Sequence, residues 1–240
     1  MTNVRSTTIG PFHDISAVLG PTLSLFFGNF WLITKIVVVI FAPFEIFKAL
    51  NVEGDEADWQ LFSGLFVLEL LCRVLVAPAL IYALLQVMDT GIAPGVNEAY
   101  RWGFNKLGKL IIAATLAFIL QALGLMLCII PGIIVFVSLV LVEPIAVLEN
   151  GSASGALQSS HELTKGHRWK IFGVSLVIWL LSLIFNAPEL ITQSWTFARG
   201  DLWPFQVAAA LFSDIFEQTL TVLSLVLYLS IRALWSQTTQ

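Results

Sequence analysis

Apolar residues fall in long runs along this chain, and shorter polar stretches between them hold most of the charges. Six runs approach or exceed the ~20 residues that span a hydrocarbon layer of ~30 Å as a helix. They cover residues 30–50, 61–88, 109–129, 132–149, 169–187 and 206–234. The pattern predicts an all-α fold, a polytopic transmembrane helical bundle of six spans in a single domain over residues 1–240.

Two prolines predict the local shape of the third and fourth spans. Pro131-Gly132 is the turn signal between these spans, so we expect a tight helical hairpin there. Pro144 follows Glu143 inside the fourth span, where a proline removes a helical hydrogen bond and favours a kink.

Composition supports the membrane interpretation and excludes other classes. Hydrophobic residues make up 58% of the chain and charged residues 12%, far from the roughly 25% charged residues of soluble domains. No run of basic residues indicates a nucleic-acid partner. Cys72 and Cys128 lie inside apolar runs, which is typical of inert thiols. The first 23 residues lack a compact apolar core, and this argues against a cleaved signal peptide.

Basic residues in the short loops predict the orientation, because Lys and Arg concentrate on the cytoplasmic side. In a six-span chain, one side of the membrane holds the N-terminal segment, the C-terminal segment and the segments 90–109 and 150–170. The basic residues on this side are Arg5, Arg101, Lys106, Lys109, Lys165, Arg168, Lys170 and Arg232. The opposite side has Lys48, Arg199 and an acidic loop over 51–58. We therefore expect both termini in the cytoplasm.

The two basic segments resemble each other at an offset of 60 residues, with Gly91 aligned on Gly151 and Gly95 on Gly155. Each reads as a short amphipathic helix before a span, with apolar stripes at helical spacing. The stripes contain Val96, Ala99, Gly103 and Leu107 in the first copy, and Ala156, Ser160, Leu163 and His167 in the second. A weaker copy, broken by Pro21, precedes the first span. Candidate repeat units are 10–90, 91–150 and 151–240, each an interfacial helix followed by two spans.

Several motifs resemble a known family. They are Ile130-Pro-Gly-Ile-Ile, Glu143-Pro144 and the stretch from Gly155 to Lys170, with Ile9-Gly10 and Gly28-Asn-Phe-Trp31 near the start. Together they look like the membrane domain fused to some bacterial glycerophosphodiester phosphodiesterases and like its stand-alone YciC-type relatives. The resemblance implies a six-span bacterial inner-membrane protein. The soluble phosphodiesterase barrel has no counterpart in this sequence, so its activity does not carry over.

Catalytic and cofactor motifs are absent from the sequence. It has no glycine-rich phosphate loop, Cys-x-x-Cys, His-Glu-x-x-His or Gly-x-Ser-x-Gly. His161 and His167 are six residues apart and fall on different helix faces, which disfavours a metal site. We expect no enzyme activity, no cofactor and no metal. The candidates for binding anionic lipid headgroups are Arg101, Lys106, Lys109, Lys165, Arg168 and Lys170; the alternative is that these charges only set the topology.

Charged residues within the spans form the second candidate site. A charge at the bilayer centre costs roughly 2.5–3.5 kcal/mol, so such residues usually face the protein interior and pair. Glu69 and Arg73 are one helical turn apart, and Asp214 and Glu217 share a face of the sixth span. Equal depth predicts that Arg73 contacts Asp214 or Glu217. Three acids around one base also leave an excess of negative charge, so we expect at least one carboxyl to be neutral. Lys35 and Glu45, near opposite ends of the first span, are expected to snorkel.

Three functions remain open from the sequence. The least favoured is an intramembrane enzyme, because five buried acids could do acid/base work but no nucleophile or metal set accompanies them. The preferred one is a non-enzymatic integral membrane protein that interacts with lipid or serves as an accessory subunit of a larger membrane assembly. The alternative is a secondary transporter with a polar intramembrane site between spans two and six, although the sequence gives no pair of corresponding broken helices. Lipid, anionic lipid above all, and other membrane subunits are the expected partners. The same cluster of Glu69, Arg73, Asp214 and Glu217 could instead be a structural lock of the bundle.

Overall fold

The computed structural model describes residue 12 and residues 15–51, 59–196 and 203–238, and every regular element among them is a helix. In chain order the helices are α1 (Ser16–Gly28), α2 (Phe30–Asn51), α3 (Trp59–Thr90), α4 (Val96–Phe104), α5 (Leu107–Leu127), α6 (Ile129–Leu139), α7 (Val142–Leu148), α8 (Ala153–Thr164), α9 (Arg168–Thr196), α10 (Trp203–Glu217) and α11 (Thr219–Thr238). The all-α prediction is confirmed.

Six helical stretches are long and apolar enough to cross a membrane, as the sequence predicts. They are Phe30–Leu50, Gly64–Thr90, Leu107–Leu127, Ile129–Leu148, Arg168–Ile191 and Trp203–Trp235. The fourth combines α6 with α7, and the sixth combines α10 with α11. Their ends differ from the predicted ones by a few residues, because the length of an apolar run does not fix where a helix begins or ends.

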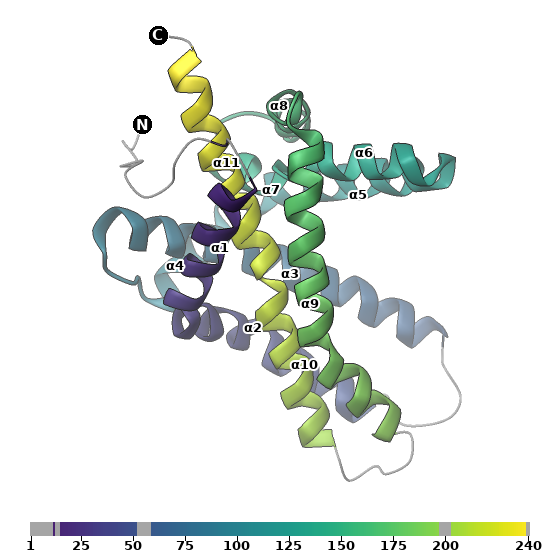
Figure 1. Ribbon diagram of the computed structural model, residues 1–240. Helices are drawn as coiled ribbons and strands as arrows, with labels where there is room; N and C mark the ends of the chain where they lie inside the picture. The colour runs from purple at the N-terminus through teal and green to yellow at the C-terminus, as the bar shows by residue number, and fades with distance from the viewer. Residues whose placement is uncertain (1–11, 13–14, 52–58, 197–202, 239–240) are drawn as a thin grey trace.

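A short helix precedes each pair of spans: α1 before α2 and α3, α4 before α5 and α6–α7, and α8 before α9 and α10–α11. This order agrees with the predicted three-unit plan, and the duplication itself stays a prediction. Figure 1 shows α4 at the left and α8 at the top, while the α5–α6 turn points to the right and the facing ends of α9 and α10 point downwards. The α5–α6 turn and the facing ends of α9 and α10 thus point away from α4 and α8.

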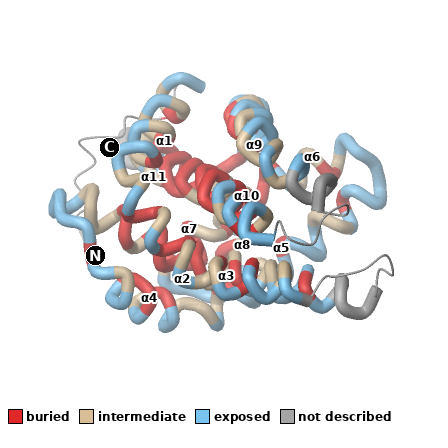
Figure 2. Tube along the Cα trace, turned by 90° about the horizontal axis from the view of Figure 1, so that it is seen from below, coloured by how far each residue is buried: buried red, intermediate tan, exposed pale blue. Residues whose placement is uncertain are grey.

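The core forms around α11, which packs against α1, α3, α7 and α9. In the sixth span 72% of the most apolar stretch is buried, against 22% in the third. Figure 2 shows this difference in colour, with α11 largely red and α5 largely pale blue. The sixth span is therefore the central helix, and α5 presents most of its surface outwards, where a bilayer supplies the apolar surroundings.

The hairpin between the third and fourth spans is present, but its turn lies at Cys128 and not at Pro131-Gly132. Cys128 is extended, with φ −176° and ψ 160°, whereas Pro131 and Gly132 are helical within α6. Pro131 occupies the first turn of α6, where a helix leaves its N–H groups unbonded, so the proline costs nothing there. Gly132 instead allows close contact: a Cβ at this position would lie 2.6 Å from Leu125 Cδ2.

The short helices have the predicted faces. In α4, Ala99, Tyr100 and Gly103 are buried, and in α8, Ala156, Ser160 and Leu163 are buried. Glu98 and Glu162 are exposed on the opposite faces. The prediction that Pro21 breaks the first short helix is wrong, because α1 continues through it.

Both short helices donate a hydroxyl group to a backbone carbonyl of a spanning helix. Tyr100 Oη donates to the Ile36 carbonyl of α2 at 2.6 Å, and Ser160 Oγ donates to the Ser138 carbonyl of α6 at 2.8 Å. Burial raises the pKa of the Tyr100 phenol above its usual range, so this donor keeps its proton at physiological pH. These bonds fix α4 and α8 in register on the spans beneath them.

Candidate functional site

Arg73 is the centre of an intramembrane charge cluster. Its Nη2 atom lies 2.7 Å from Glu69 Oε1, one turn earlier on α3, and its Nη1 atom pairs with Glu217 Oε1 at the end of α10. The predicted contact between spans two and six is therefore present. All three side chains are about a third exposed, and one guanidinium fork serves two carboxylates.

Asp214, the other predicted partner of Arg73, has a different environment. It is 7% exposed, and its Oδ2 atom lacks a hydrogen-bond partner among the described residues. The neighbouring Ser213 Oγ is likewise buried without such a partner. One face of α10 thus carries both an ion-paired acid and a buried acid with an unsatisfied oxygen.

A second ion pair lies on α2, and the sequence interpretation missed it. Glu45 is 3% exposed, and Lys48 Nζ donates to its Oε1 atom at 2.9 Å. Glu45 was expected to snorkel from the end of the first span, and that expectation is wrong because α10 packs against α2 and covers it. The spacing of three residues between an acid and a base was the signal that could have found this pair.

Two spans are discontinuous. The fourth breaks at Val140–Leu141 between α6 and α7, and the sixth breaks at Gln218 between α10 and α11. The kink predicted at Glu143-Pro144 therefore occurs before these residues, and Pro144 lies in the first turn of α7. Each break falls in the second span of its predicted repeat unit, so a pair of corresponding broken helices exists.

Helix α3, which carries Arg73, packs against both broken spans through α7 and α11. Glu217, which pairs with Arg73, directly precedes the break at Gln218. Glu143, two residues after Leu141, interacts electrostatically with Arg73. Discontinuous helices that meet at a charged residue are a feature of intramembrane binding sites.

The predicted headgroup cations have unequal surroundings. Arg101 and Lys165 are exposed, and Lys170 is exposed at the start of α9. Arg168 Nη2 lies 3.1 Å from His161 Nε2, and Lys106 Nζ lies 5.8 Å from the centre of the Trp102 ring. These positions leave cationic groups at the ends of two spans.

Lys109 differs from the other candidates because its side chain forms a hydrogen bond within the protein. Its Nζ atom donates to the Glu149 carbonyl at the end of α7, at 2.8 Å. The side chain of Glu149 accepts a hydrogen bond from Tyr228 Oη at 3.1 Å and pairs with Arg232 of α11. Glu149 was not predicted as a site residue, since the sequence shows it only as an acid at the end of the fourth predicted span. This cluster ties the ends of three spans together.

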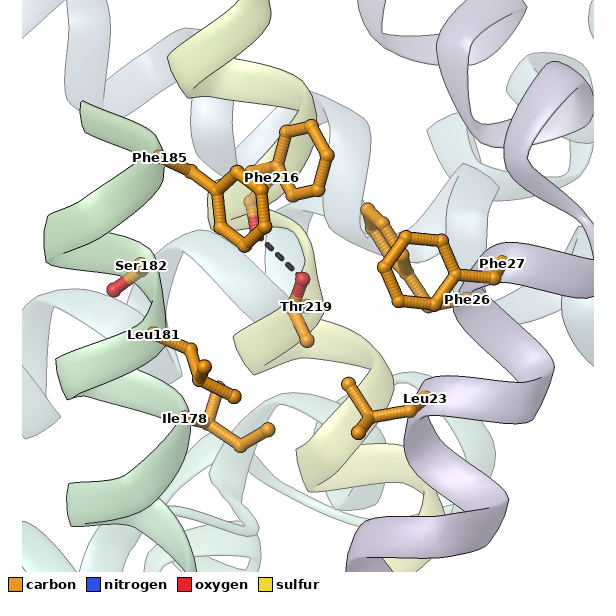
Figure 3. Close-up of a pocket in the computed structure, with 9 residues that line it drawn as sticks. All are labelled: Leu23, Phe26, Phe27, Ile178, Leu181, Ser182, Phe185, Phe216 and Thr219. Carbon is orange, nitrogen blue, oxygen red and sulfur yellow. Dashed lines mark hydrogen bonds between the residues drawn. The ribbon is translucent and has the colours of Figure 1, made fainter. Parts of the chain in front are cut away.

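An apolar pocket lies beside the break in the sixth span (Figure 3). Phe185 of α9 and Phe216 of α10 stack with ring centres 3.9 Å apart, and Phe26 of α1 approaches Phe216 at 5.5 Å. Thr219 Oγ1 donates to the Phe216 carbonyl at 2.6 Å, which satisfies part of the interrupted backbone. Aromatic side chains of α1, α9 and α10 thus pack beside the break in the sixth span.

Within the described ranges, His, Cys, Asp and Glu side chains form no group of three that could hold a metal ion. Six apolar spanning helices and charges gathered between them define a polytopic α-helical membrane protein. The chain belongs to the family described as Domain of unknown function (DUF7847), which matches residues 60–235. No curated protein and no solved structure matches it significantly.

Proposed function

We propose that this multi-pass membrane protein is non-enzymatic and binds anionic lipid headgroups at the cytoplasmic face of a bacterial inner membrane, with both termini in the cytoplasm. The observation that carries the proposal is the arrangement of α4 and α8. Each buries an apolar face on the spans, exposes a polar face and precedes a span whose first turn is basic.

The charges support anionic lipid in particular. Lys165, Arg168 and Lys170 surround the junction of α8 and α9, and Arg101 and Lys106 adjoin the start of α5. A basic residue near an anionic membrane surface contributes about 1 kcal/mol to binding. The resemblance of the Gly155–Lys170 stretch to the membrane domain of glycerophosphodiester phosphodiesterases and YciC-type proteins fits the same proposal.

The accessory subunit of a larger membrane assembly is the other form of this proposal. A secondary transporter is the second candidate, and a specific observation favours it. Arg73 pairs with Glu217, directly before the break in the sixth span, and α3 also packs against α7 of the broken fourth span. Transport would also require water to reach that site in another conformation.

The lipid proposal predicts that replacing the three cations at the α8–α9 junction weakens binding of phosphatidylglycerol. In the variant with Lys165→Gln, Arg168→Gln and Lys170→Gln, we expect about a hundredfold loss at low salt, from about 1 kcal/mol for each cation. Native mass spectrometry of the detergent-purified protein measures the retained lipid and any co-purifying subunit.

Glu162→Gln on α8 is the matched control, since it changes a charge at the same surface and keeps every cation. It should retain phosphatidylglycerol as the unmodified protein does. Equal retention of phosphatidylglycerol and phosphatidylcholine, or no loss in the triple variant, would contradict the lipid proposal. Stoichiometric recovery of another membrane protein without lipid would favour the accessory subunit.

A further inference from the structure

Asp214 is enclosed within the bundle, about 16 Å along α10 from Trp203 at 1.5 Å per residue. Helices α2 and α9 pack against α10, and Asp214 is only 7% exposed. Its Oδ2 atom and the adjacent Ser213 Oγ lack hydrogen-bond partners among the described residues. A buried polar atom of this kind costs free energy unless something satisfies it.

The two cations near Asp214 are already paired with other acids. Arg73 contacts Glu69 and Glu217, and Lys48 contacts Glu45. Both cations act on Asp214 through electrostatic interaction, but no ion pair joins either of them to its carboxyl group in the described part of the chain. Asp214 therefore has no counter-ion of its own.

The charged groups around Asp214 add negative charge. Glu45 and Lys48 face it from α2, Arg73 from α3 and Glu189 from α9, while Cys72 of α3 also lies within electrostatic range. With Glu69 and Glu217, the described part of the cluster would hold four ionised acids, Glu45, Glu69, Asp214 and Glu217, against the two bases Lys48 and Arg73. A positive charge is needed to reduce this excess.

We propose that Asp214 is a proton-binding site inside the membrane, enclosed by α2, α3, α9 and α10. A proton on Oδ2 removes the charge of the carboxyl group, and the resulting O–H becomes a donor where the carboxylate had only acceptors. A proton fits better than a metal ion that needs three His, Cys, Asp or Glu ligands, because the described residues form no such group. The break at Gln218 lies one helical turn after Asp214. A change in the charge of Asp214 would therefore act on the sixth span at this break.

The test is infrared difference spectroscopy of the full chain in zwitterionic nanodiscs, which removes anionic lipid from the measurement. At neutral pH the protein should show the C=O stretch of a protonated carboxyl group, and the band should be lost in Asp214→Asn. Asp89→Asn is the matched control, because Asp89 is exposed at the end of α3. Replacing choline by sodium at constant pH should leave the band unchanged.

Three results would overturn the proposal. They are a missing band at neutral pH, a band that persists in Asp214→Asn, and a band that sodium removes at constant pH, which would mean that the site takes a sodium ion. If Asp214→Asn does not fold, Asp214→Glu should fold with a shifted band, and an unshifted band would assign the signal to another acid. None of these readings depends on lipid binding or on transport.

Discussion

Arg73→Met is expected to destabilise the bundle by about 2 kcal/mol, because it leaves Glu69 and Glu217 facing each other without their shared cation. Removing one partner of a fully buried ion pair costs roughly 3–5 kcal/mol of stability. The cost is smaller here because these side chains are about a third exposed. The free energy of unfolding in mixed detergent micelles, followed by tryptophan fluorescence, measures the loss.

The rescue variant separates a structural lock from a functional site. Arg73→Met combined with Glu69→Leu and Glu217→Leu should recover most of the stability, because well-packed apolar groups replace buried ion pairs at little or no cost. Arg101→Met, on the exposed face of α4, is the control and should change stability by less than about 0.5 kcal/mol. If Arg73→Met alone were as stable as the unmodified protein, the ion pairs of Arg73 would not stabilise the fold.

Gly132→Leu is expected to force α5 and α6 apart, at a cost of about 3 kcal/mol, the upper end of typical overpacking. A Cβ at Gly132 would lie 2.6 Å from Leu125 Cδ2 and 3.0 Å from Leu125 Cα. The first contact could be relieved by a new rotamer of Leu125, but the second involves backbone and could not. Spin labels at Phe118 and Phe136, both exposed on the hairpin, should report a longer distance.

Gly108→Ala is the matched control in the same hairpin, since no atom outside its own turn lies within 4 Å of the added Cβ. Alanine is favoured over glycine inside a helix by roughly 0.5–1 kcal/mol, so this variant should be slightly more stable. Gly132→Ala should be destabilised, and adding Leu125→Ala should reduce the loss. An unchanged hairpin distance in Gly132→Leu would contradict the close packing.

The sequence predicted the features that depend on hydrophobicity and helical spacing. Six spans, the amphipathic faces of α4 and α8, and the contact of Arg73 with Glu217 all follow from run length, 3.6-residue periodicity and equal depth in the membrane. These properties are local or are set by the bilayer, which holds spans at common depths whatever their neighbours are.

Apart from that charge-paired contact, features that depend on which helices touch could not be predicted. Glu45 is buried because α10 covers α2, and Lys109 is bonded because the end of α7 reaches it. The local sequence around Glu45 or Lys109 does not indicate which helix will pack against it. The positions of the turn and the kink were also predicted wrongly from proline. Pro131 and Pro144 lie in the first turns of their helices, where the missing N–H is harmless, and the helices are interrupted a few residues earlier.

The most direct test of the six-span arrangement with one basic face is cysteine accessibility in intact cells. In a Cys72→Ala and Cys128→Ser background, single cysteines are placed at Asp55, Glu98 and Glu162 and treated with a membrane-impermeant maleimide. We predict that Asp55→Cys is labelled in intact cells, while Glu98→Cys and Glu162→Cys are labelled only after permeabilisation. Labelling of all three positions from the same side would contradict the arrangement.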